Sequence, residues 1–242
     1  MSEQRSAAEK AHAKHVREMF ARIAKRYDLL NHLLSGNIDK RWRRLVAEEV
    51  RKRLPASQAR ILDVACGTGD LSLTLFEFTK AQVTATDFCR PMLDIAVRKA
   101  LQRRRSIRFV EGDALGLPFL DGAFDAVTIG FGLRNVAALE DGLRELLRIL
   151  KPGGCLAVLE FSKPQTPGLR RLFQVYFTKL LPLMGGAISG SRSAYTYLPD
   201  SVQRFPDQEE LASLIRKVGF DQVSYQNLTG GIAALHLAQR PK

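Results

Sequence analysis

From residue 60 onward, short runs of β-branched and apolar residues alternate with longer segments of helical periodicity. A strand, a helix and a second strand in succession return the chain to one sheet in parallel, so this alternation predicts a parallel sheet covered on both faces. The expected strands are 60–65, 81–87, 106–113, 124–132 and 154–162. The expected helices are 69–79, 90–103 and 137–150. Lys151-Pro152-Gly153-Gly154 should stop the last helix and turn the chain into the next strand.

Two further strand candidates lie near the C-terminus. DQVSYQNL (221–228) and IAALHLAQR (232–240) flank Gly230-Gly231, a tight turn that predicts an antiparallel pair. A helix after Pro206-Asp207 precedes them. The expected fold class is therefore α/β, with a seven-stranded, mostly parallel sheet and an antiparallel edge strand.

The net charge of +12 is unevenly distributed. Residues 1–53 carry 14 Lys and Arg against seven Asp and Glu, and they are expected to form a separate helical lid or dock on a main domain of residues 54–242. Such a surface suits a polyanion, either nucleic acid or the anionic face of a membrane, although a solvated helix without a partner has the same composition. Charge alone does not choose between these readings.

The chain lacks the signals of secretion, membrane insertion and metal binding. Its first twenty residues are polar and of mixed charge, and its longest apolar stretch, 180–188, is shorter than the roughly 17–25 residues that span a bilayer. Cys66, Cys89 and Cys155 lie far apart, with no CxxC pair, which predicts free thiols and no metal site. We expect a cytoplasmic protein.

The stretch ILDVACGTGD (61–70) places Gly67, Thr68 and Gly69 between a strand and a helix, a common way to hold a nucleotide. The carboxylates of Asp63 and Asp70 flank this loop and would repel a pyrophosphate. S-adenosylmethionine carries a sulfonium, an ammonium and one carboxylate, so the acidic surroundings favour it over a dinucleotide.

Two more acids close the following strands. Asp87 ends the second strand, where a carboxylate can accept hydrogen bonds from both ribose hydroxyls. Asp113, beside Ala114, ends the third strand and can accept from an adenine amino group. Each acid alone could be a cap or a turn residue, but carboxylates at three successive strand ends predict one ligand crevice.

Several motifs resemble the ubiquinone/menaquinone biosynthesis C-methyltransferases. The similarity runs from about Phe20 to the C-terminus; its most restrictive parts are YDLLNHLLSG (27–36), FGLRNV (131–136) and LEFSKP (159–164). The resemblance implies a Rossmann-like class I fold, S-adenosylmethionine as cofactor and methylation of a prenylated quinol ring, with cofactor contacts at Thr68, Asp87, Asp113 and Ala114. Some ubiquinone-pathway members have serine where this chain has Gly130, so Gly130 is left out of the site.

Methylation of a quinol carbon needs a phenolate stabiliser or a proton acceptor, because the phenolate increases charge on the ring carbon. Arg134 is expected to stabilise the phenolate and Asn135 to hydrogen-bond the ring oxygen or the cofactor. Arg134 cannot act as a base, so Asp28 and His32, four apart on one helical face, are the base candidates. The alternatives are an ion pair of Arg134 with Glu140 and a surface position for His32.

The expected substrate is lipophilic. Tyr27 and Asn31 are expected to line the same lid as the base candidates. An apolar stripe in residues 169–184 could be core packing or a wall for the isoprenoid tail; its members are Leu169, Leu172, Phe173, Tyr176, Phe177 and Leu180. The basic N-terminal region would then contact anionic lipid, as a peripheral protein on the inner face of the cytoplasmic membrane.

Alternatives remain within and beyond this family. We favour demethylmenaquinol as acceptor over the methoxybenzoquinol of the ubiquinone pathway. An RNA methyltransferase would share the fold and the basic surface, but neither an NPPY-like motif nor a cysteine motif follows the fourth strand, so we expect no nucleic-acid partner. A protein that only retains S-adenosylmethionine is the non-enzymatic alternative, and a homo-oligomer is left open.

Overall fold

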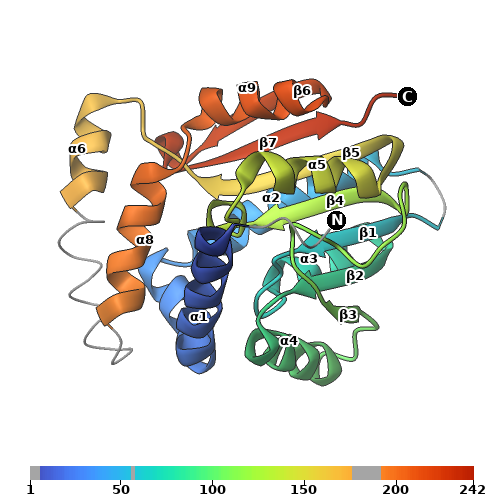
Figure 1. Ribbon diagram of the computed structural model, residues 1–242, viewed down its shortest axis with the longest axis horizontal. Coiled ribbons are helices and arrows are strands. Elements are labelled where there is room, and N and C mark those ends of the chain that lie inside the picture. The colour runs from blue at the N-terminus through green and yellow to red at the C-terminus, as the bar shows by residue number, and fades with distance from the viewer. Residues whose placement is uncertain (1–5, 56–57, 176–191) are drawn as a thin grey trace.

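The computed structural model describes residues 6–55, 58–175 and 192–242, and these contain the expected alternation of strands and helices (Figure 1). Seven strands form one sheet in the order β3-β2-β1-β4-β5-β7-β6. Their bounds are β1 (Arg60–Val64), β2 (Gln82–Asp87), β3 (Arg108–Glu111), β4 (Phe124–Gly130), β5 (Leu150–Phe161), β6 (Asp221–Leu228) and β7 (Ala233–Gln239). β7 runs antiparallel to β5 and to the edge strand β6, and the other pairs are parallel. The predicted sheet is confirmed.

Helices cover both faces of the sheet. Their bounds are α1 (Ala7–Leu34), α2 (Ile38–Arg53), α3 (Asp70–Thr79), α4 (Arg90–Gln102), η1 (Leu133–Asn135), α5 (Leu139–Ile149), α6 (Pro167–Val175), α8 (Arg192–Arg204), α9 (Gln208–Val218) and η3 (Thr229–Gly231). Because β1 lies between β2 and β4, the direction of winding reverses between β1 and β4. Open α/β sheets bind ligands outside the carboxyl ends of the strands at such a reversal.

Two cores follow from the alternation of side chains along the strands. On β1, Leu62 packs in a cluster with Leu143 of α5 and Ile215 of α9, whereas Ile61 packs in a cluster with Val46 of α2 and Leu75 of α3. Neighbouring residues of a strand point to opposite faces, so a nearly continuous apolar run such as that of β1 has to be buried on both sides.

The prediction for Lys151-Pro152-Gly153-Gly154 was wrong in one respect, because β5 already begins at Leu150. The pairing with β4 shifts between Leu150 and Cys155, and the residues between them bulge. Gly153 N–H donates to Arg240 O, and Arg240 N–H donates to Gly154 O, both at 2.9 Å. The residue that follows β7 thus supplies hydrogen bonds to Gly153 and Gly154 within the strand.

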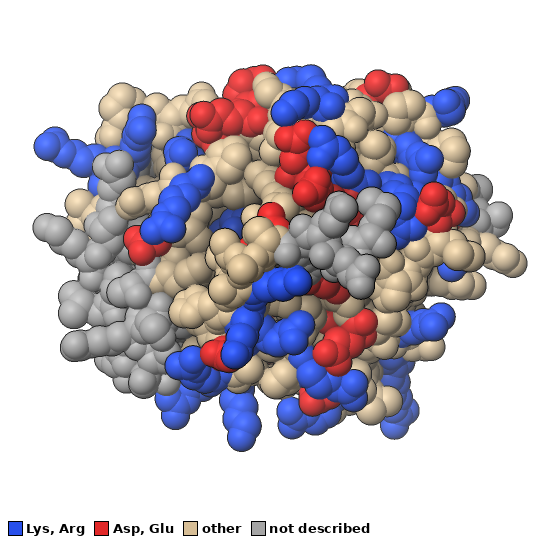
Figure 2. All heavy atoms as spheres, in the orientation of Figure 1, with Lys and Arg blue, Asp and Glu red and all other residues tan. Residues whose placement is uncertain are grey.

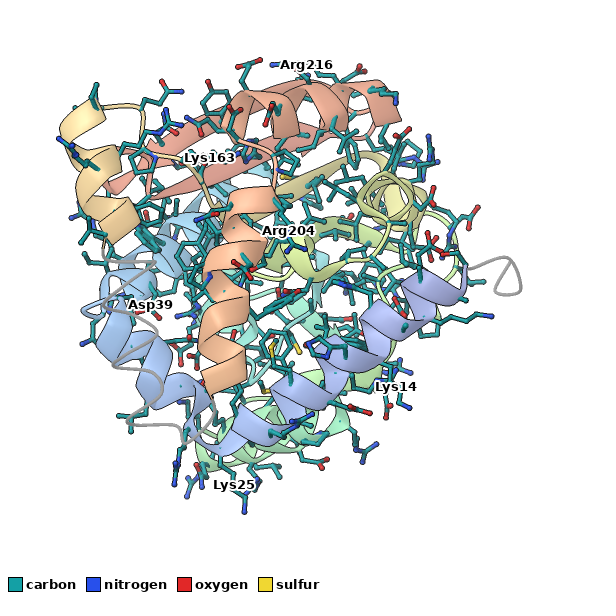
Figure 3. All side chains as sticks on the ribbon, turned by 60° about the vertical axis from the view of Figure 1, so that its left-hand side comes forward. Lys14, Lys25, Asp39, Lys163, Arg204 and Arg216 are labelled. Carbon is teal, nitrogen blue, oxygen red and sulfur yellow. The ribbon has the colours of Figure 1, made fainter. Side chains whose placement is uncertain are left out.

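Basic side chains are spread over the helical surface. In Figure 2, Lys and Arg side chains project along the lower edge of the molecule, where α1 and α4 lie in the same view of Figure 1. Figure 3 shows Lys14 and Lys25 pointing from α1 into solvent. Across the described part of the chain, none of the helices is both long and apolar enough to cross a membrane.

The packing of α2 bears on the boundary predicted at residue 53. Trp42 of α2 is 6% exposed and joins the core cluster of Ile61 and Leu75. Its Nε1–H donates to Thr229 Oγ1 at 3.1 Å, and its ring centroid lies 6.0 Å from that of Phe131. A separate unit of residues 1–53 stays a prediction, and Trp42 offers the means to test it.

Trp42→Ala should lower the free energy of unfolding of the whole protein by about 3–5 kcal/mol, because it empties a buried site shared by α2 and the sheet. Urea titration followed by circular dichroism would show a single transition at lower urea. Leu101→Ala, at a side chain that is 69% exposed, should stay within about 0.5 kcal/mol of the parent. A new early transition, with the main one unmoved, would instead show that residues 1–53 unfold separately.

Candidate functional site

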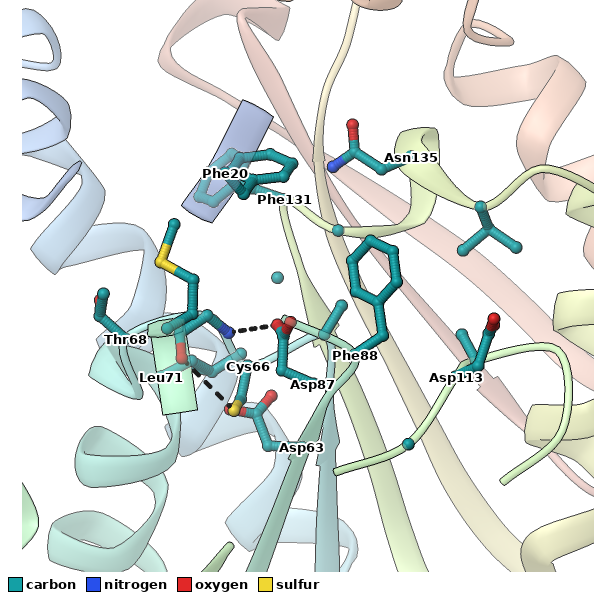
Figure 4. Close-up of a pocket in the computed structure, with 18 of the residues that line it drawn as sticks. Phe20, Asp63, Cys66, Thr68, Leu71, Asp87, Phe88, Asp113, Phe131 and Asn135 are labelled. Atoms are coloured by element: carbon teal, nitrogen blue, oxygen red, sulfur yellow. Dashed lines mark hydrogen bonds between the residues drawn. The ribbon is translucent and has the colours of Figure 1, made fainter. Parts of the chain in front are cut away.

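A cleft lies at the carboxyl ends of β1, β2 and β4, at the expected reversal of the sheet (Figure 4). It encloses about 1010 Å³ of space when the open solvent at its mouth is included. Of the predicted cofactor residues, Gly67, Thr68, Asp87, Asp113 and Ala114 line it, whereas Gly69 does not. Other lining residues include Phe20, Tyr27, Arg43, Asp63, Asp70, Phe88, Gly130, Phe131 and Asn135.

The glycine loop between β1 and α3 is held in place from two sides. Gly67 N–H donates to Asp87 Oδ2 at 2.8 Å, which ties the loop to the end of β2. Gly69 precedes α3 with φ of +82°, and a Cβ there would lie only 3.0 Å from Ala96 Cβ. Glycine at 69 is therefore required by both the left-handed backbone and the approach of α4.

Asp87 is the central acid of the cleft. It is 6% exposed, and its Oδ1 accepts from Cys89 N–H at 2.8 Å while Oδ2 accepts from the glycine loop. Burial raises the pKa of Asp87 to about 6, against the opposing effect of its backbone hydrogen bonds. In Figure 4 its carboxylate points into the cleft between Cys66 and Phe88.

The two neighbouring acids differ in exposure. Asp63 is fully buried and accepts from Ser72 Oγ at 2.5 Å and Thr128 Oγ1 at 2.8 Å; desolvation raises its pKa to about 6. Asp113 is partly exposed on the loop after β3, where its Oδ1 accepts from Leu115 N–H at 2.9 Å. The structure thus brings the three predicted strand-end acids to one cleft, with Asp63 at its buried floor.

Asp28, one of the base candidates, joins α1 to the glycine loop. Thr68 Oγ1 donates to Asp28 Oδ1 at 2.5 Å, and Lys99 Nζ lies 2.9 Å from Asp28 Oδ2. Lys99 also pairs with Asp70 in the first turn of α3. Asp28 itself is not among the described residues that line the cleft.

His32, the other candidate, belongs to the same joint. Its Nδ1 lies 2.9 Å from Asp39 Oδ2 and its Nε2 lies 3.4 Å from Asp70 Oδ2. Arg43 pairs with Asp39. Burial alone would raise the pKa of Asp39, but hydrogen bonds from Ser35 and Arg43 outweigh this effect and lower it. The contacts of Asp28 and His32 hold α1 and α2 against the glycine loop. That either residue acts as the base stays a prediction.

Arg134 lies in η1 behind the cleft. Its guanidinium pairs with Glu160 at 2.8 Å, not with the expected alternative Glu140, and their side chains are 5% and 1% exposed. Glu140 instead pairs with Arg144 and Lys217. The Nε–H of Arg134 is buried and has no acceptor among the described residues.

A second cavity adjoins the cleft on the side of Arg134. Arg134 and Tyr197 line this cavity, and both cavities are lined by Val136 and Ala137. Asn135 lines the cleft, and its Oδ1 accepts from the Tyr197 hydroxyl at 3.0 Å. Arg134 and Asn135 therefore lie at the wall shared by the two cavities.

Sequence reasoning missed much of the apolar lining and one cation. Phe20 and Phe88 follow no pattern that marks a ligand site, and Phe131 begins the FGLRNV motif but was not named as a site residue. In Figure 4 Phe20 and Phe131 lie above Asp87. Gly130, which the sequence analysis excludes from the site, lines the cleft. Arg43 lines it too, but it is one of four neighbouring basic residues, and only the structure shows that this one reaches the cleft. Tyr27 was expected and is present; burial raises its pKa, and Asn31 hydrogen-bonds it.

The predicted apolar stripe of residues 169–184 is described only in part. Phe173 of α6 packs with Met19 and Ile23 of α1. Residues 176–184 and the side chains of Leu169 and Leu172 lie outside the described residues. The wall for an isoprenoid tail therefore stays a prediction.

Comparison with known proteins decides the family. The chain matches the ubiE/COQ5 methyltransferase family over residues 7–240. It belongs to that family. Similar proteins include the demethylmenaquinone methyltransferase of Thermus thermophilus, which is 52% identical with 92% of this chain and 100% of the relative covered. That of Deinococcus radiodurans is 47% identical, with 93% and 92% covered. The ubiquinone/menaquinone biosynthesis C-methyltransferase UbiE of Pseudomonas aeruginosa is 43% identical, with 95% and 90% covered.

Solved structures confirm the fold class. A SAM-dependent methyltransferase of Thermotoga maritima, described as a possible histamine N-methyltransferase, superposes with a TM-score of 0.63 at 21% identity, covering 92% of this chain and 98% of that one. Phosphoethanolamine N-methyltransferase 2 of Haemonchus contortus, solved with S-adenosyl-L-methionine, has a TM-score of 0.60 at 15% identity, covering 81% and 52%. At these identities the likeness shows the Rossmann-like class I methyltransferase fold alone.

The pKa of Asp87 gives a prediction about ligand binding and pH. If its carboxylate accepts ribose hydroxyls, affinity for S-adenosylmethionine should fall as pH drops below about 6, by at most tenfold per unit for one proton. Calorimetry between pH 5 and 7.5 measures this dependence. Asp87→Asn should bind weakly across the range, and Asp63→Asn separates the contribution of the second acid.

Stability of the unliganded protein should depend on pH in the opposite sense. The native Asp87 holds its proton up to about pH 6, whereas the unfolded chain loses it near 3.8. Its contribution to the free energy of unfolding therefore decreases as pH rises through this interval.

An affinity for S-adenosylmethionine that stays constant between pH 5 and 7.5 would contradict the assignment of Asp87 to the ribose.

Proposed function

We propose that this protein transfers a methyl group from S-adenosylmethionine to a ring carbon of demethylmenaquinol. The observation that carries the proposal is the match over nearly the whole length with relatives named demethylmenaquinone methyltransferase, at 52% and 47% identity. The relative at 43% is named for both ubiquinone and menaquinone biosynthesis, so the methoxybenzoquinol of the ubiquinone pathway is the second candidate acceptor.

The cleft fits the proposed cofactor by its chemistry. Asp87 and Asp113 offer carboxylate acceptors for the ribose hydroxyls and the adenine amino group, and the Ala114 backbone lies beside the latter. The loop of Gly67, Thr68 and Gly69 would hold the methionine part. When bound, S-adenosylmethionine supplies an electrophilic methyl group on a positively charged sulfur, which an acidic lining stabilises.

The chain's own groups would act on the acceptor at the wall between the two cavities. Phe20, Phe88 and Phe131 exclude water and pack against a flat ring. The free Nε–H of Arg134 and the side chain of Asn135 are donors suited to a ring oxygen, and they would favour its phenolate form. Asp28 and His32 remain the proposed proton acceptors, reached through water or a movement of α1.

A peripheral association with the membrane would bring the enzyme to its prenylated acceptor. The basic face of α1, with Lys14 and Lys25 directed outward, supports this proposal (Figure 3). Each well-placed Lys or Arg contributes about 1 kcal/mol at an anionic lipid surface. The cytoplasmic membrane face is the proposed location, and a homo-oligomer is compatible with it.

The acceptor can be identified with purified protein and a radiolabelled methyl donor. We expect labelled menaquinol from demethylmenaquinol, and less or no product from the methoxybenzoquinol or from tRNA. In a strain that lacks the gene, demethylmenaquinone should accumulate. An unchanged quinone pool, or labelling of tRNA alone, would overturn the proposed function.

Arg134→Lys tests the phenolate role while keeping a cation beside Glu160, whose buried charge would otherwise be left unpaired. Loss of the Nε–H donor should lower kcat by about 10- to 100-fold, with little change in the Kd of S-adenosylmethionine. Arg144→Lys, on the exposed face of α5, is the matched control. A variant that loses cofactor affinity and not turnover would place Arg134 in cofactor binding.

Asp28→Asn and His32→Gln examine the proton acceptor in the same assay. If one of these residues is the base, its replacement should remove the rise of kcat with pH that the parent enzyme shows. A variant that changes only the cofactor Kd would show that the residue holds the lid.

A further inference from the structure

The charged residues that line the cleft are mostly acidic. Four carboxylates face it, those of Asp63, Asp70, Asp87 and Asp113, whereas among the described residues the only Lys or Arg in the lining is Arg43. The proposed cofactor has two cationic groups and one carboxylate. The four carboxylates suit the sulfonium, the ammonium and the ribose hydroxyls of the cofactor. The guanidinium of Arg43 is the one charged group in the described lining that is opposite in sign to the carboxylate of the cofactor.

Arg43 is held in position by the helix that carries it. On α2 it follows the buried Trp42 and precedes the buried Val46, so its backbone is fixed by the core. Its side chain is only 12% exposed, although its neighbours Arg41 and Arg44 are exposed to solvent. Arg43 is therefore a preorganised cation, whereas the other two are surface charges.

Part of the guanidinium of Arg43 is still available. Nη1 pairs with Asp39 and lies 3.9 Å from Asp70 Oδ2. Nε and Nη2 donate to none of the described groups, and a guanidinium carries five N–H donors in a fork that matches a carboxylate. A ligand carboxylate can thus bind Arg43 without displacing Asp39.

The carboxylate of Asp70 does not block such a ligand. Lys99 pairs with it, and His32 Nε2 lies 3.4 Å away. The charge of Arg43 also reaches the cleft: it opposes part of the rise that burial causes in the pKa of Tyr27 and of Asp63, and together with Lys99 it lowers the pKa of Asp70 against the effect of burial. Arg43 therefore places a positive charge near the amino-terminal end of α3, where the glycine loop lines the cleft.

We propose that Arg43 binds the carboxylate of the methionine moiety of S-adenosylmethionine, and that a helix preceding the sheet thereby selects the amino-acid end of the donor. This inference rests on the proposed cofactor. It adds a binding residue outside the glycine loop and the strand ends, and it explains why Arg43 is turned inward in a run of basic residues.

The test removes the proposed ion pair in two ways, by taking the carboxylate from the ligand and by taking the guanidinium from the protein. Calorimetry would compare S-adenosylmethionine with its decarboxylated form, which lacks only the carboxylate, on the parent protein and on Arg43→Gln. The parent should bind the decarboxylated donor about 10- to 100-fold more weakly. Arg43→Gln should bind S-adenosylmethionine as weakly as the parent binds the decarboxylated donor, with its affinity for the decarboxylated donor unchanged within about threefold.

Two further variants make the result specific. Arg41→Gln, which removes an exposed charge from the same helix, should retain the preference for the carboxylate. Arg43→Lys should retain part of it, because the charge remains and the fork is lost. If Arg43→Gln does not fold, the comparison of the two donors on the parent protein and on Arg43→Lys decides.

The outcomes separate this inference from the proposed function. A parent protein that binds both donors equally, or an Arg43→Gln variant that loses affinity equally for both, overturns the role of Arg43 and leaves the cofactor assignment intact. A parent protein that binds neither donor overturns the proposed cofactor and the inference with it.

Discussion

The site depends on one buried carboxylate, that of Asp87. Its two oxygens accept the backbone N–H groups of Gly67 and Cys89, so it fixes the glycine loop after β1 and the start of α4 after β2. Burial disfavours the charged form of this group and raises its pKa to about 6. A carboxylate held at such a cost gains more from a hydroxyl donor or a nearby cation than a solvated one does, which suits it to a sulfonium nucleoside.

Most of the fold could be predicted because its signals are local. The apolar runs and helical periods lie within single elements, and the antiparallel pair follows from the Gly230-Gly231 turn between β6 and β7. The start of β5 could not be predicted in this way. There, Gly153 and Gly154 stay in the strand through hydrogen bonds to Arg240, which lies far along the chain.

The candidate site was predictable where position along a strand determines position in space. Asp87 is the last residue of β2 and Asp113 follows β3, and parallel strands bring their carboxyl ends to one edge of the sheet. The ion-pair partner of Arg134 depends on tertiary packing: it is Glu160 of β5, and not Glu140, which the sequence offered as the alternative. Likewise, nothing in four basic residues at 40, 41, 43 and 44 shows which one faces inward.

The attachment of α1 changes along its length. Asp28 and His32, near its carboxyl end, are bonded to Thr68 and Asp70, whereas Phe20, two turns earlier, covers the cleft with an apolar ring. Ion pairs weaken in salt and apolar contacts do not, so ionic strength acts on one end of this helix more than on the other. A higher salt concentration should therefore weaken the attachment of the carboxyl end of α1 to the glycine loop, while the packing of Phe20 over the cleft persists.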